Sequence, residues 1–228
     1  MNLYLVRLLQ ENPVFSHLNN EVINKLFDFA VQQNYHSGEI LTLAGDIWPF
    51  LFMVGDGSIT VLKESSEGRG LSIAEFKPGD LFWGPAFFQE EALNPVTMKF
   101  DQDSLIFLWS RERILPILLE NGALTWELSR LMVTRMLNAS DLITGLAFQQ
   151  VAGRLAHLLL KFPNDNQKGP MVRSLTLDDM ASRIGSTREM VCRFLQGFAN
   201  QGIIKITRTE LEIIDRDQLE ALSQKEKA

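Results

Sequence analysis

The sequence predicts an α+β fold with three parts: an N-terminal β-roll, a long helix and a C-terminal winged helix-turn-helix. Three changes of pattern predict it. Short apolar runs separated by glycine turns extend from Tyr35 to about Trp109, and a proline-free helical pattern extends from Leu124 to about Lys161. A compact tail then combines two short helices with two short strands. The predicted domains are residues 1–121, 122–148 and 149–228.

The composition indicates a globular chain that can bury a core in each part. Of its 228 residues, 46% are hydrophobic, which suffices for two packed domains. No apolar run approaches the roughly 18 residues that a membrane-spanning helix needs. The start, MNLYLVRLLQENP, also lacks a basic leader followed by a long apolar stretch and a cleavage site. We therefore expect a cytoplasmic protein with no membrane partner.

Metal, cofactor and disulfide chemistry are poorly supplied. The single cysteine, Cys192, excludes an internal disulfide and a cysteine cluster for iron–sulfur or structural zinc. Metal-dependent β-roll enzymes usually gather two or three histidines and a carboxylate, whereas the three histidines here (His17, His36 and His157) are scattered. No serine or cysteine lies in a glycine-rich nucleophile elbow. We expect no metal, no cofactor and no enzymatic activity; a metal-dependent β-roll enzyme or metallosensor is the alternative.

The first half of the chain changes from helix to strand patterns. Residues 1–34 are predicted to form short helices, which Pro13 and the pair Asn19-Asn20 interrupt before EVINKLFDFA. Strand-like runs such as EILTLA, LFMVGDGSITVLKE and SLIFLWS follow, with glycine-containing turns between them. The polar stretch SSEGRG at residues 65–70 suits a hairpin tip. This succession predicts the β-roll.

The long helix carries two apolar stripes and so needs two partners. One stripe alternates 4 and 3 spacings, and its predicted role is a seam with the same helix of a second chain. The predicted dimer interface comprises Leu124, Leu128, Leu131, Asn138 and Leu142. The other stripe, which includes Met132 and Met136, would pack on the roll. The alternative is a long helix buried within a monomer.

The tail is predicted to be a winged helix-turn-helix. It follows the loop PNDNQKGP at residues 163–170. Thr176 lies three residues before Asp179, a plausible capping pair, and Gly185 ends the helix that they begin. Ser186 or Thr187 can cap the next helix. GIIKITRTELEIID then predicts two apolar strands around an Arg208-Thr209 turn, which would form the wing.

The second helix of this motif, residues 186–198, has two unlike faces. One face is an apolar stripe for burial that includes Val191 and Leu195, while the other carries charge. In a helix-turn-helix the second helix lies in the DNA major groove, so we expect Arg188 and Arg193 to bind guanine and Glu189 to accept from cytosine. The alternative is a solvated face with a Glu189–Arg193 pair.

Other polar residues of the tail are predicted to contact the phosphates of double-stranded DNA, because hydroxyls, amides, arginines and a helix N-terminus suit them. The predicted phosphate contacts are Thr176, Ser186, Thr187, Gln196, Thr207 and Arg208. Residues 171–216 hold seven Lys and Arg against six Asp and Glu, so this segment is +1 in a chain of net charge −6. The charge distribution favours DNA binding only weakly.

These motifs together resemble the Crp/Fnr family of bacterial transcription regulators over nearly the whole chain. LTLDDMASRIGSTREMVCRFLQGFANQGII is similar to the family's DNA-binding signature, and GLAFQQVAGRLAHLLL resembles its hinge. The resemblance implies a cyclic-nucleotide-binding-like jelly roll as sensor, a dimerisation helix and a homodimer that reads a two-fold symmetric site near TGTGA. It also implies RNA polymerase as a further partner. Arg188, Glu189 and Arg193 match the family's base-reading positions.

The effector region departs from the family's cyclic-nucleotide binders, as the stretch FWGPAFFQEEALNPVTMKF shows. Pro85 stands where their ribose-binding glutamate is expected, and Asn94-Pro95-Val96 stands about where their phosphate-binding arginine is expected. On the long helix Ala139 replaces a threonine that contacts adenine, although Ser140 remains. A cyclic phosphate would lose its charge partner, so we expect that cAMP is not the effector. Iron–sulfur sensors of the family use a cysteine cluster and haem sensors use an axial histidine. This sequence has one cysteine, and none of its histidines lies in a setting that marks it as an axial ligand.

Two interpretations of the effector region remain. The candidate pocket, suited to a hydrophobic small molecule, comprises Trp83, Gly84, Pro85, Met98, Met132, Arg135 and Met136. Aromatic residues and methionines at these spacings are more often plain core, in which case the protein would bind DNA without an effector. Cys192, on the second helix of the motif, is either a redox switch or an inert helix residue.

Overall fold

The computed structural model describes residues 3–66, 70–161, 171–172, 175–207 and 209–224. The chain divides into two compact units. One comprises Met1–Glu64 and Ile73–Asn138, and the other comprises Ser65–Ser72 and Ala139–Ala228. The division falls inside the long helix, so the predicted three-part domain limits stay a prediction. The hairpin tip at 67–69, the loop at 163–170 and Arg208 lie outside the described residues.

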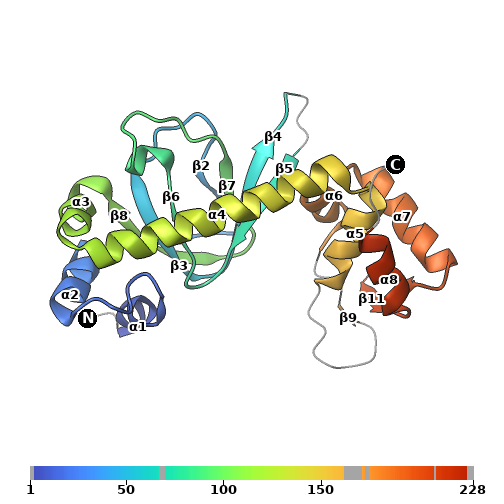
Figure 1. Cartoon of the computed structure of the whole chain (residues 1–228), viewed down its shortest axis with the longest axis horizontal. Helices are drawn as coiled ribbons and strands as arrows, with labels where there is room; N and C mark the ends of the chain where they lie inside the picture. Colours follow the sequence, from blue (N-terminus) through green and yellow to red (C-terminus); the bar gives the residue numbers. More distant parts are fainter. Residues whose placement is uncertain (1–2, 67–69, 162–170, 173–174, 208, 225–228) are drawn as a thin grey trace. The chain divides into compact units, whose positions relative to one another are not determined.

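The first unit is a β-roll with helices on one side. Figure 1 shows its strands and helices in the blue and green part of the chain. The elements up to the third helix are α1 (Leu3–Glu11), α2 (Asn20–Phe29), β1 (Val31–Tyr35), β2 (Ile40–Thr42), β3 (Phe50–Asp56), β4 (Ile59–Glu64), β5 (Gly70–Phe76), β6 (Leu81–Trp83), η1 (Pro85–Phe87), β7 (Thr97–Phe100), β8 (Ser104–Ser110) and α3 (Arg111–Glu120). All belong to the first unit except the first three residues of β5. Eight short strands within about eighty residues confirm the fold class expected from the glycine-punctuated apolar runs.

The roll consists of two four-stranded sheets whose orders are β1-β8-β3-β6 and β2-β7-β4-β5. Both faces of the first sheet are apolar because its central strands alternate between two cores. On β3, Leu51 and Met53 pack toward the helices α1, α2 and α3, whereas Phe52 and Val54 pack toward the second sheet. The continuous apolar runs of β3 and β8 follow from this double burial.

One segment of the roll differs from the prediction. Residues 31–34 were expected to be helical, but Val31–Tyr35 is β1, paired with β8 at the edge of the first sheet. The prediction failed because four of the five residues of β1 are exposed, so an edge strand of this kind shows no apolar alternation. The helix before it is as expected: the Asn19 side chain caps α2 by accepting from the N–H of Val22.

The long helix α4 runs from Gly122 to Phe148 and is continuous in Figure 1. Gln150 follows as the N-cap of α5 (Val151–Leu160). The proline-free stretch therefore holds two helices, which a short break at 149–150 separates. No helix within the described part of the chain is both long enough and apolar enough to cross a membrane.

The second unit is a winged helix-turn-helix with its own core. Its remaining elements are β9 (Met171–Val172), α6 (Leu177–Ile184), α7 (Arg188–Asn200), β10 (Ile204–Ile206), β11 (Glu210–Ile213) and α8 (Arg216–Ser223). The sheet order is β10-β11-β9, all antiparallel. Residues from α5, α6, α7, α8 and the sheet share one apolar core, in which Leu155, Leu195 and Leu219 are buried. The two predicted wing strands are confirmed; β9 was not predicted.

Candidate functional site

The turn between α6 and α7 is specified by local sequence chemistry. Thr176 and Asp179 form a reciprocal capping box at the start of α6. Gly185 ends the helix in the left-handed region at φ 60°. The N–H of Ser186 donates to the Ala181 carbonyl at 2.9 Å, and the N–H of Gly185 donates to that of Ser182, as in a Schellman motif. The predicted helix–glycine turn–helix is confirmed.

Thr187 sets the start of the second helix, α7. Its side chain caps the helix by accepting from the N–H of Met190 at 3.3 Å, which settles the choice between Ser186 and Thr187. Val191, Leu195 and Phe198 form the buried face of α7. The opposite face is exposed and carries Arg188, Glu189, Arg193 and Gln196. The packing of the buried face therefore fixes the orientation of the charged face of α7.

Each charged residue of this exposed face has a partner on its own unit. Arg188 Nη1 lies 2.8 Å from Asp178 Oδ2 of α6. The Arg193 guanidinium donates to the sulfur of Met190 and lies 5.5 Å from the centre of the Phe194 ring. The Glu189–Arg193 pair, which belongs to the alternative interpretation of this face, does not appear among the ion pairs of the described residues. Exposed contacts of this kind are weak and exchangeable.

The Glu189 carboxylate is held by the start of its own helix. Its own backbone N–H, the Thr187 hydroxyl and the charge of Arg188 lower its pKa, in that order. All three favour the ionised form, which is the form that accepts hydrogen bonds. Glu189 is therefore an acceptor at neutral pH.

Several of the predicted phosphate contacts already make hydrogen bonds within the protein. The Thr176 and Thr187 hydroxyls serve as helix caps, and the Thr207 hydroxyl accepts from the N–H groups of Thr209 and Glu210. Ser186 is half-buried and Gln196 is exposed on α7. A structural role within the turn and the wing is thus established for three of the hydroxyls, and their contact with DNA stays a prediction.

Arg154 of α5 positions the helix-turn-helix, and sequence reasoning missed it. Its Nε donates to the Ile184 carbonyl at 2.7 Å, and Nη1 donates to the Gln149 carbonyl at 2.7 Å. Burial lowers its pKa. Arg154 therefore ties the start of α5 to the C-terminal end of α6, where carbonyl groups lack helical partners. An arginine in the otherwise apolar run GRLAHLLL was the available signal.

The predicted effector residues do not assemble into one pocket. Met98 is 0% exposed in the core between the two sheets, whereas Met136 is 64% exposed on α4. Met98 of β7 is therefore plain core, the alternative that the sequence left open, and Met136 faces away from the roll because a helical spacing does not say which face of α4 meets it. Trp83 stacks on Phe82, Pro85 begins the short helix η1, and at Gly84 a Cβ would clash with the Trp48 carbonyl. Met132 is half-buried on α4.

Arg135 is the charged residue that the structure does place against the roll. Its guanidinium lies 4.6 Å from the centre of the Phe76 ring, and Nη2 donates to the Leu81 carbonyl at 3.2 Å. Asp80 lies 3.9 Å away, and Nε is buried without a hydrogen-bond partner among the described residues. Burial lowers the pKa of Arg135, and Asp80 partly offsets this.

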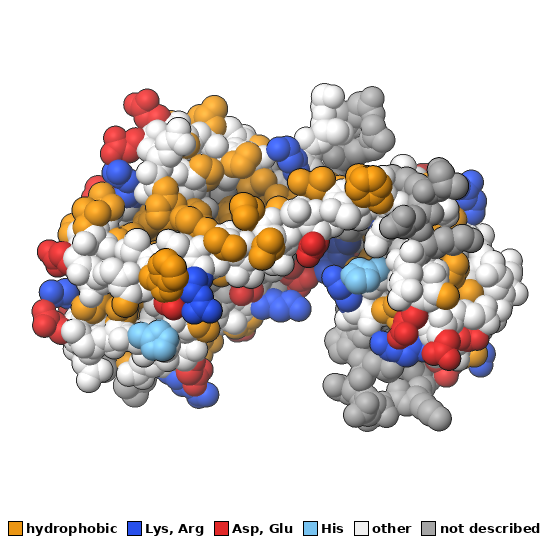
Figure 2. Space-filling model, viewed as in Figure 1, with side chains coloured by type: hydrophobic (Ala, Val, Ile, Leu, Met, Phe, Trp, Pro, Cys, Tyr) orange, Lys and Arg blue, Asp and Glu red, His pale blue; other side chains and the backbone are white. Residues whose placement is uncertain are grey.

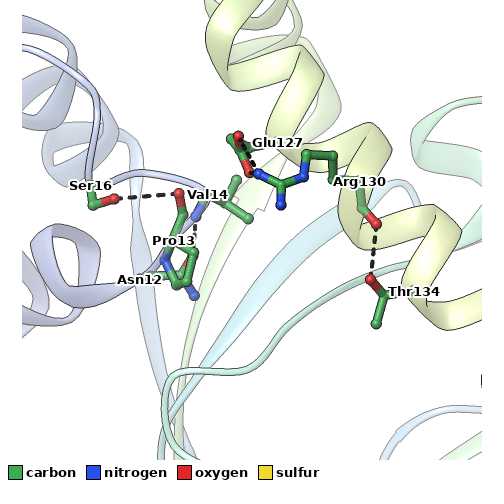
Figure 3. Close-up of polar contacts among 7 residues, drawn as sticks. All are labelled: Asn12, Pro13, Val14, Ser16, Glu127, Arg130 and Thr134. Atoms are coloured by element: carbon green, nitrogen blue, oxygen red, sulfur yellow. Dashed lines mark hydrogen bonds and ion pairs between the residues drawn. The ribbon is translucent and has the colours of Figure 1, made fainter.

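A groove of about 620 Å³ lies beside α4. Figure 3 shows its two sides: the loop residues Asn12, Pro13 and Val14 face Glu127, Arg130 and Thr134 of α4. The Asn12 side chain accepts from the N–H of Val14 at 2.9 Å and donates to the Gly79 carbonyl at 2.7 Å, which fixes the loop. Of the predicted effector residues, only Arg135 lines this groove.

The predicted dimer seam needs correction. Leu124 and Leu128 are 1% and 2% exposed because they pack in the core of their own roll, and Leu131 packs against the same core. Leu142 is half-buried and Asn138 is exposed. Five of the large apolar residues that α4 exposes form another stripe, called here the exposed α4 stripe: Trp126, Val133, Met136, Leu137 and Ile143. Phe148, at the end of α4, is exposed as well. Orange side chains along α4 mark it in Figure 2.

A metal site is not evident in the described part of the chain: no three His, Cys, Asp or Glu side chains come together there. His36 is a surface residue whose Nδ1 lies 3.5 Å from Asp103. Cys192 is half-buried on α7.

Comparison with known proteins agrees with this architecture. Residues 32–121 match the family model described as cyclic nucleotide-binding domain, and residues 153–222 match the Crp-like helix-turn-helix domain. The chain is 22% identical to the Cyclic AMP receptor protein of Thermus thermophilus, with 94% of this chain and 98% of the relative covered. It is 26% identical to the cAMP-activated global transcriptional regulator Vfr of Pseudomonas aeruginosa, with 87% and 94% covered.

Among solved structures, the fold is similar to that of a crp/fnr family transcriptional regulator from Eubacterium rectale. The TM-score is 0.76 at 23% identity, and the match covers 93% of this chain and 98% of the other. A β-roll and a winged helix-turn-helix with an exposed arginine-bearing helix define a DNA-binding transcription regulator. The chain belongs to the Crp/Fnr family of such regulators.

Proposed function

We propose that the chain acts as a homodimer that reads a two-fold symmetric, TGTGA-like DNA site with α7 and does not use cAMP as its effector. One observation carries the proposal: α7 exposes Arg188, Glu189 and Arg193, while its opposite face is buried in the core of its unit. A helix held in this way can enter the major groove with its N-terminal half toward the bases.

The three exposed residues suit distinct base contacts. Arg188 and Arg193 have the forked guanidinium that binds guanine O6 and N7, and the ionised Glu189 can accept from cytosine N4. Arg188 must exchange its contact with Asp178 for one with DNA. Because that ion pair is exposed on both sides, the exchange costs little. Ser186 and Gln196 are left to contact phosphates at the edge of the helix.

The exposed α4 stripe supports the homodimer. Val133 and Met136 are three residues apart, and Trp126 and Ile143 continue their rows seven residues before Val133 and seven after Met136. This 3-4 alternation is that of a coiled-coil seam. Large exposed apolar residues on one helix face favour an interaction site, and a second α4 offers the complementary face by symmetry.

The environment of the expected nucleotide-binding positions supports independence from cAMP. Asn94, at the expected position of the phosphate-binding turn, is 1% exposed, and its Oδ1 lacks a hydrogen-bond partner among the described residues. No cation stands at Asn94-Pro95-Val96 to pair with a phosphate. Arg135, a candidate cation on α4, is engaged with Phe76 and Leu81 instead. The Thermus thermophilus and Pseudomonas aeruginosa relatives are named for cAMP. Those names describe the relatives, and we propose that this chain differs from them in its effector.

Fluorescence anisotropy of a labelled symmetric TGTGA duplex at one fixed salt concentration tests the proposal. We expect a Kd on the order of 10 nM without any ligand and binding to a random duplex that is at least about a thousandfold weaker. Addition of cAMP should leave the Kd unchanged. Equal binding to both duplexes would contradict base reading of this site, and tighter binding with cAMP would contradict effector independence. Site selection from random duplexes would then identify a different half-site.

A further inference from the structure

A second cavity, of about 350 Å³, opens at one end of the roll interior. Val31, Gln33 and Tyr35 alternate along β1, so they share the sheet face that holds Leu108, the partner of Val31 on β8. That face points toward the core between the two sheets, to which Leu108 belongs. None of the predicted effector residues lines this cavity. It is therefore a separate candidate site within the roll.

Aromatic residues form the largest group in the cavity wall. Phe29, Tyr35, Trp48 and Phe50 line it together with aliphatic side chains. The Trp48 and Phe50 rings lie 5.6 Å apart at 49°, a tilted arrangement whose faces and edges can receive another ring. Cavities of roughly 300–1,000 Å³ with such walls and a few polar groups are typical of small-molecule sites.

One cation at the cavity lacks a charged partner. The Arg113 guanidinium lies 5.9 Å from the centre of the Phe29 ring, and within the described residues no carboxylate or hydrogen-bond acceptor engages it. Its neighbour Arg111, by contrast, lies 2.7 Å from Glu90 and donates to the Phe87 carbonyl. Arg113 is therefore available to an anion from outside the chain.

The polar groups near Arg113 are compatible with a bound anion. The Gln33 side-chain oxygen accepts from the Tyr35 hydroxyl, so its amide N–H groups are left as donors at the cavity. The Glu112 carboxylate is bound by its own backbone N–H and the Ser110 hydroxyl, both of which lower its pKa. A ligand carboxylate would thus meet two donors, Arg113 and Gln33.

We propose that this cavity binds a small aromatic monocarboxylate, with its ring among Phe29, Trp48 and Phe50 and its carboxylate on Arg113. The aromatic wall accounts for the preference for a planar ring over an aliphatic chain. The single unpaired arginine accounts for the single negative charge. This site does not depend on the proposed DNA recognition or on the effector region beside α4.

Isothermal titration calorimetry of the full chain with 2-naphthoate tests the proposal. We expect one site per chain with a Kd on the order of 0.1 mM. The neutral analogue 2-naphthamide and the aliphatic decanoate should each bind at least roughly tenfold more weakly, because one lacks the charge and the other lacks the ring. Absence of binding by 2-naphthoate, or tighter binding by decanoate, would overturn the proposal.

Variants locate the site. Arg113→Gln should weaken 2-naphthoate binding by about tenfold or more and leave 2-naphthamide binding unchanged. Gln33→Trp should abolish binding because the indole fills the cavity. Arg7→Gln is the matched control, since Arg7 is an exposed arginine of the same unit that pairs with Glu11, and it should bind like the unaltered chain. Undiminished 2-naphthoate binding by Arg113→Gln or by Gln33→Trp would place the ligand elsewhere and refute the assignment.

Discussion

Two helices of the molecule, α7 and α4, each bury one face and expose another, but the exposed faces are opposite in character. On α7 the exposed residues are charged and polar: Arg188, Glu189, Arg193 and Gln196. On α4 they include the large apolar side chains of the exposed α4 stripe, with Val133 51% and Ile143 66% exposed. Each face therefore suits a different kind of partner.

The two faces differ in how they interact with water. The charged side chains of α7 are well hydrated and their contacts exchange readily, so phosphates and bases can replace them. Water is a poor solvent for the apolar stripe of α4, so the free energy falls when another apolar surface covers it. These properties are consistent with the partners we propose: DNA for the first face and a second copy of α4 for the other.

The largest expected effect comes from charge placed in the exposed α4 stripe. Val133→Asp together with Ile143→Asp should separate the dimer, because two carboxylates would be buried without partners. Each monomer would then reach only one half-site, so affinity for the symmetric duplex should fall by about a hundredfold or more. Sedimentation velocity and anisotropy measure the two effects.

Leu119→Asp is the matched control for these variants, because Leu119 is an exposed leucine of α3 outside the stripe. It should leave both the mass and the DNA affinity unchanged. A doubly substituted chain that remains a dimer with unaltered circular dichroism would show that another surface carries dimerisation.

Arg193→Ala should have the next largest effect. Loss of a bidentate arginine–guanine contact should cost about 1–3 kcal/mol at the cognate site and relax the preference at one base position. Arg216→Ala, an exposed arginine of α8 that pairs with Glu220, is the control. If the Arg193 variant loses as much affinity for random DNA as for the cognate duplex, the residue contacts phosphate rather than a base.

Sequence alone predicted the helix-turn-helix because its determinants are local. The Thr176 and Asp179 capping box, the left-handed Gly185 and the Thr187 cap each depend on residues within one turn of the chain. Such signals need no knowledge of distant contacts. The buried stripe of α7 was likewise evident, because only one of its faces is apolar.

The stripes of α4 could not be assigned from the sequence, because both are apolar. Leu124 and Leu128 follow a heptad spacing as well as the exposed residues do, and only the roll core decides that they are buried. Strand β1 was missed for a related reason: its pairing with β8 is a long-range contact, and its exposed residues show no period. The cavity at Arg113 joins residues 29 to 113 and has no sequence motif.

A smaller effect, of opposite sign, is expected for Asp178→Asn. The Asp178 carboxylate competes with DNA for Arg188 at 2.8 Å and repels phosphates, so its neutralisation should raise affinity for cognate and random DNA alike, by roughly two- to fivefold. The gain should shrink at higher salt. Asp217→Asn, an exposed carboxylate of α8, is the control. A lower affinity of the Asp178 variant would mean that the ion pair holds Arg188 in its binding position.

The smallest expected effect is the pH dependence that Glu189 gives to α7. Its pKa is lowered in the folded chain, so it stabilises the fold fully above its ordinary pKa of about 4.3, and that contribution is lost as pH falls through the lower folded value. The difference in unfolding free energy between the unaltered chain and Glu189→Gln should therefore be constant from about pH 8 to 6. It should shrink only below about pH 4. Urea denaturation at each pH measures this difference. Thr187→Ala removes one hydrogen bond to the carboxylate and should move the loss to higher pH, whereas a difference that persists unchanged to pH 3 would show that Glu189 acts without its charge.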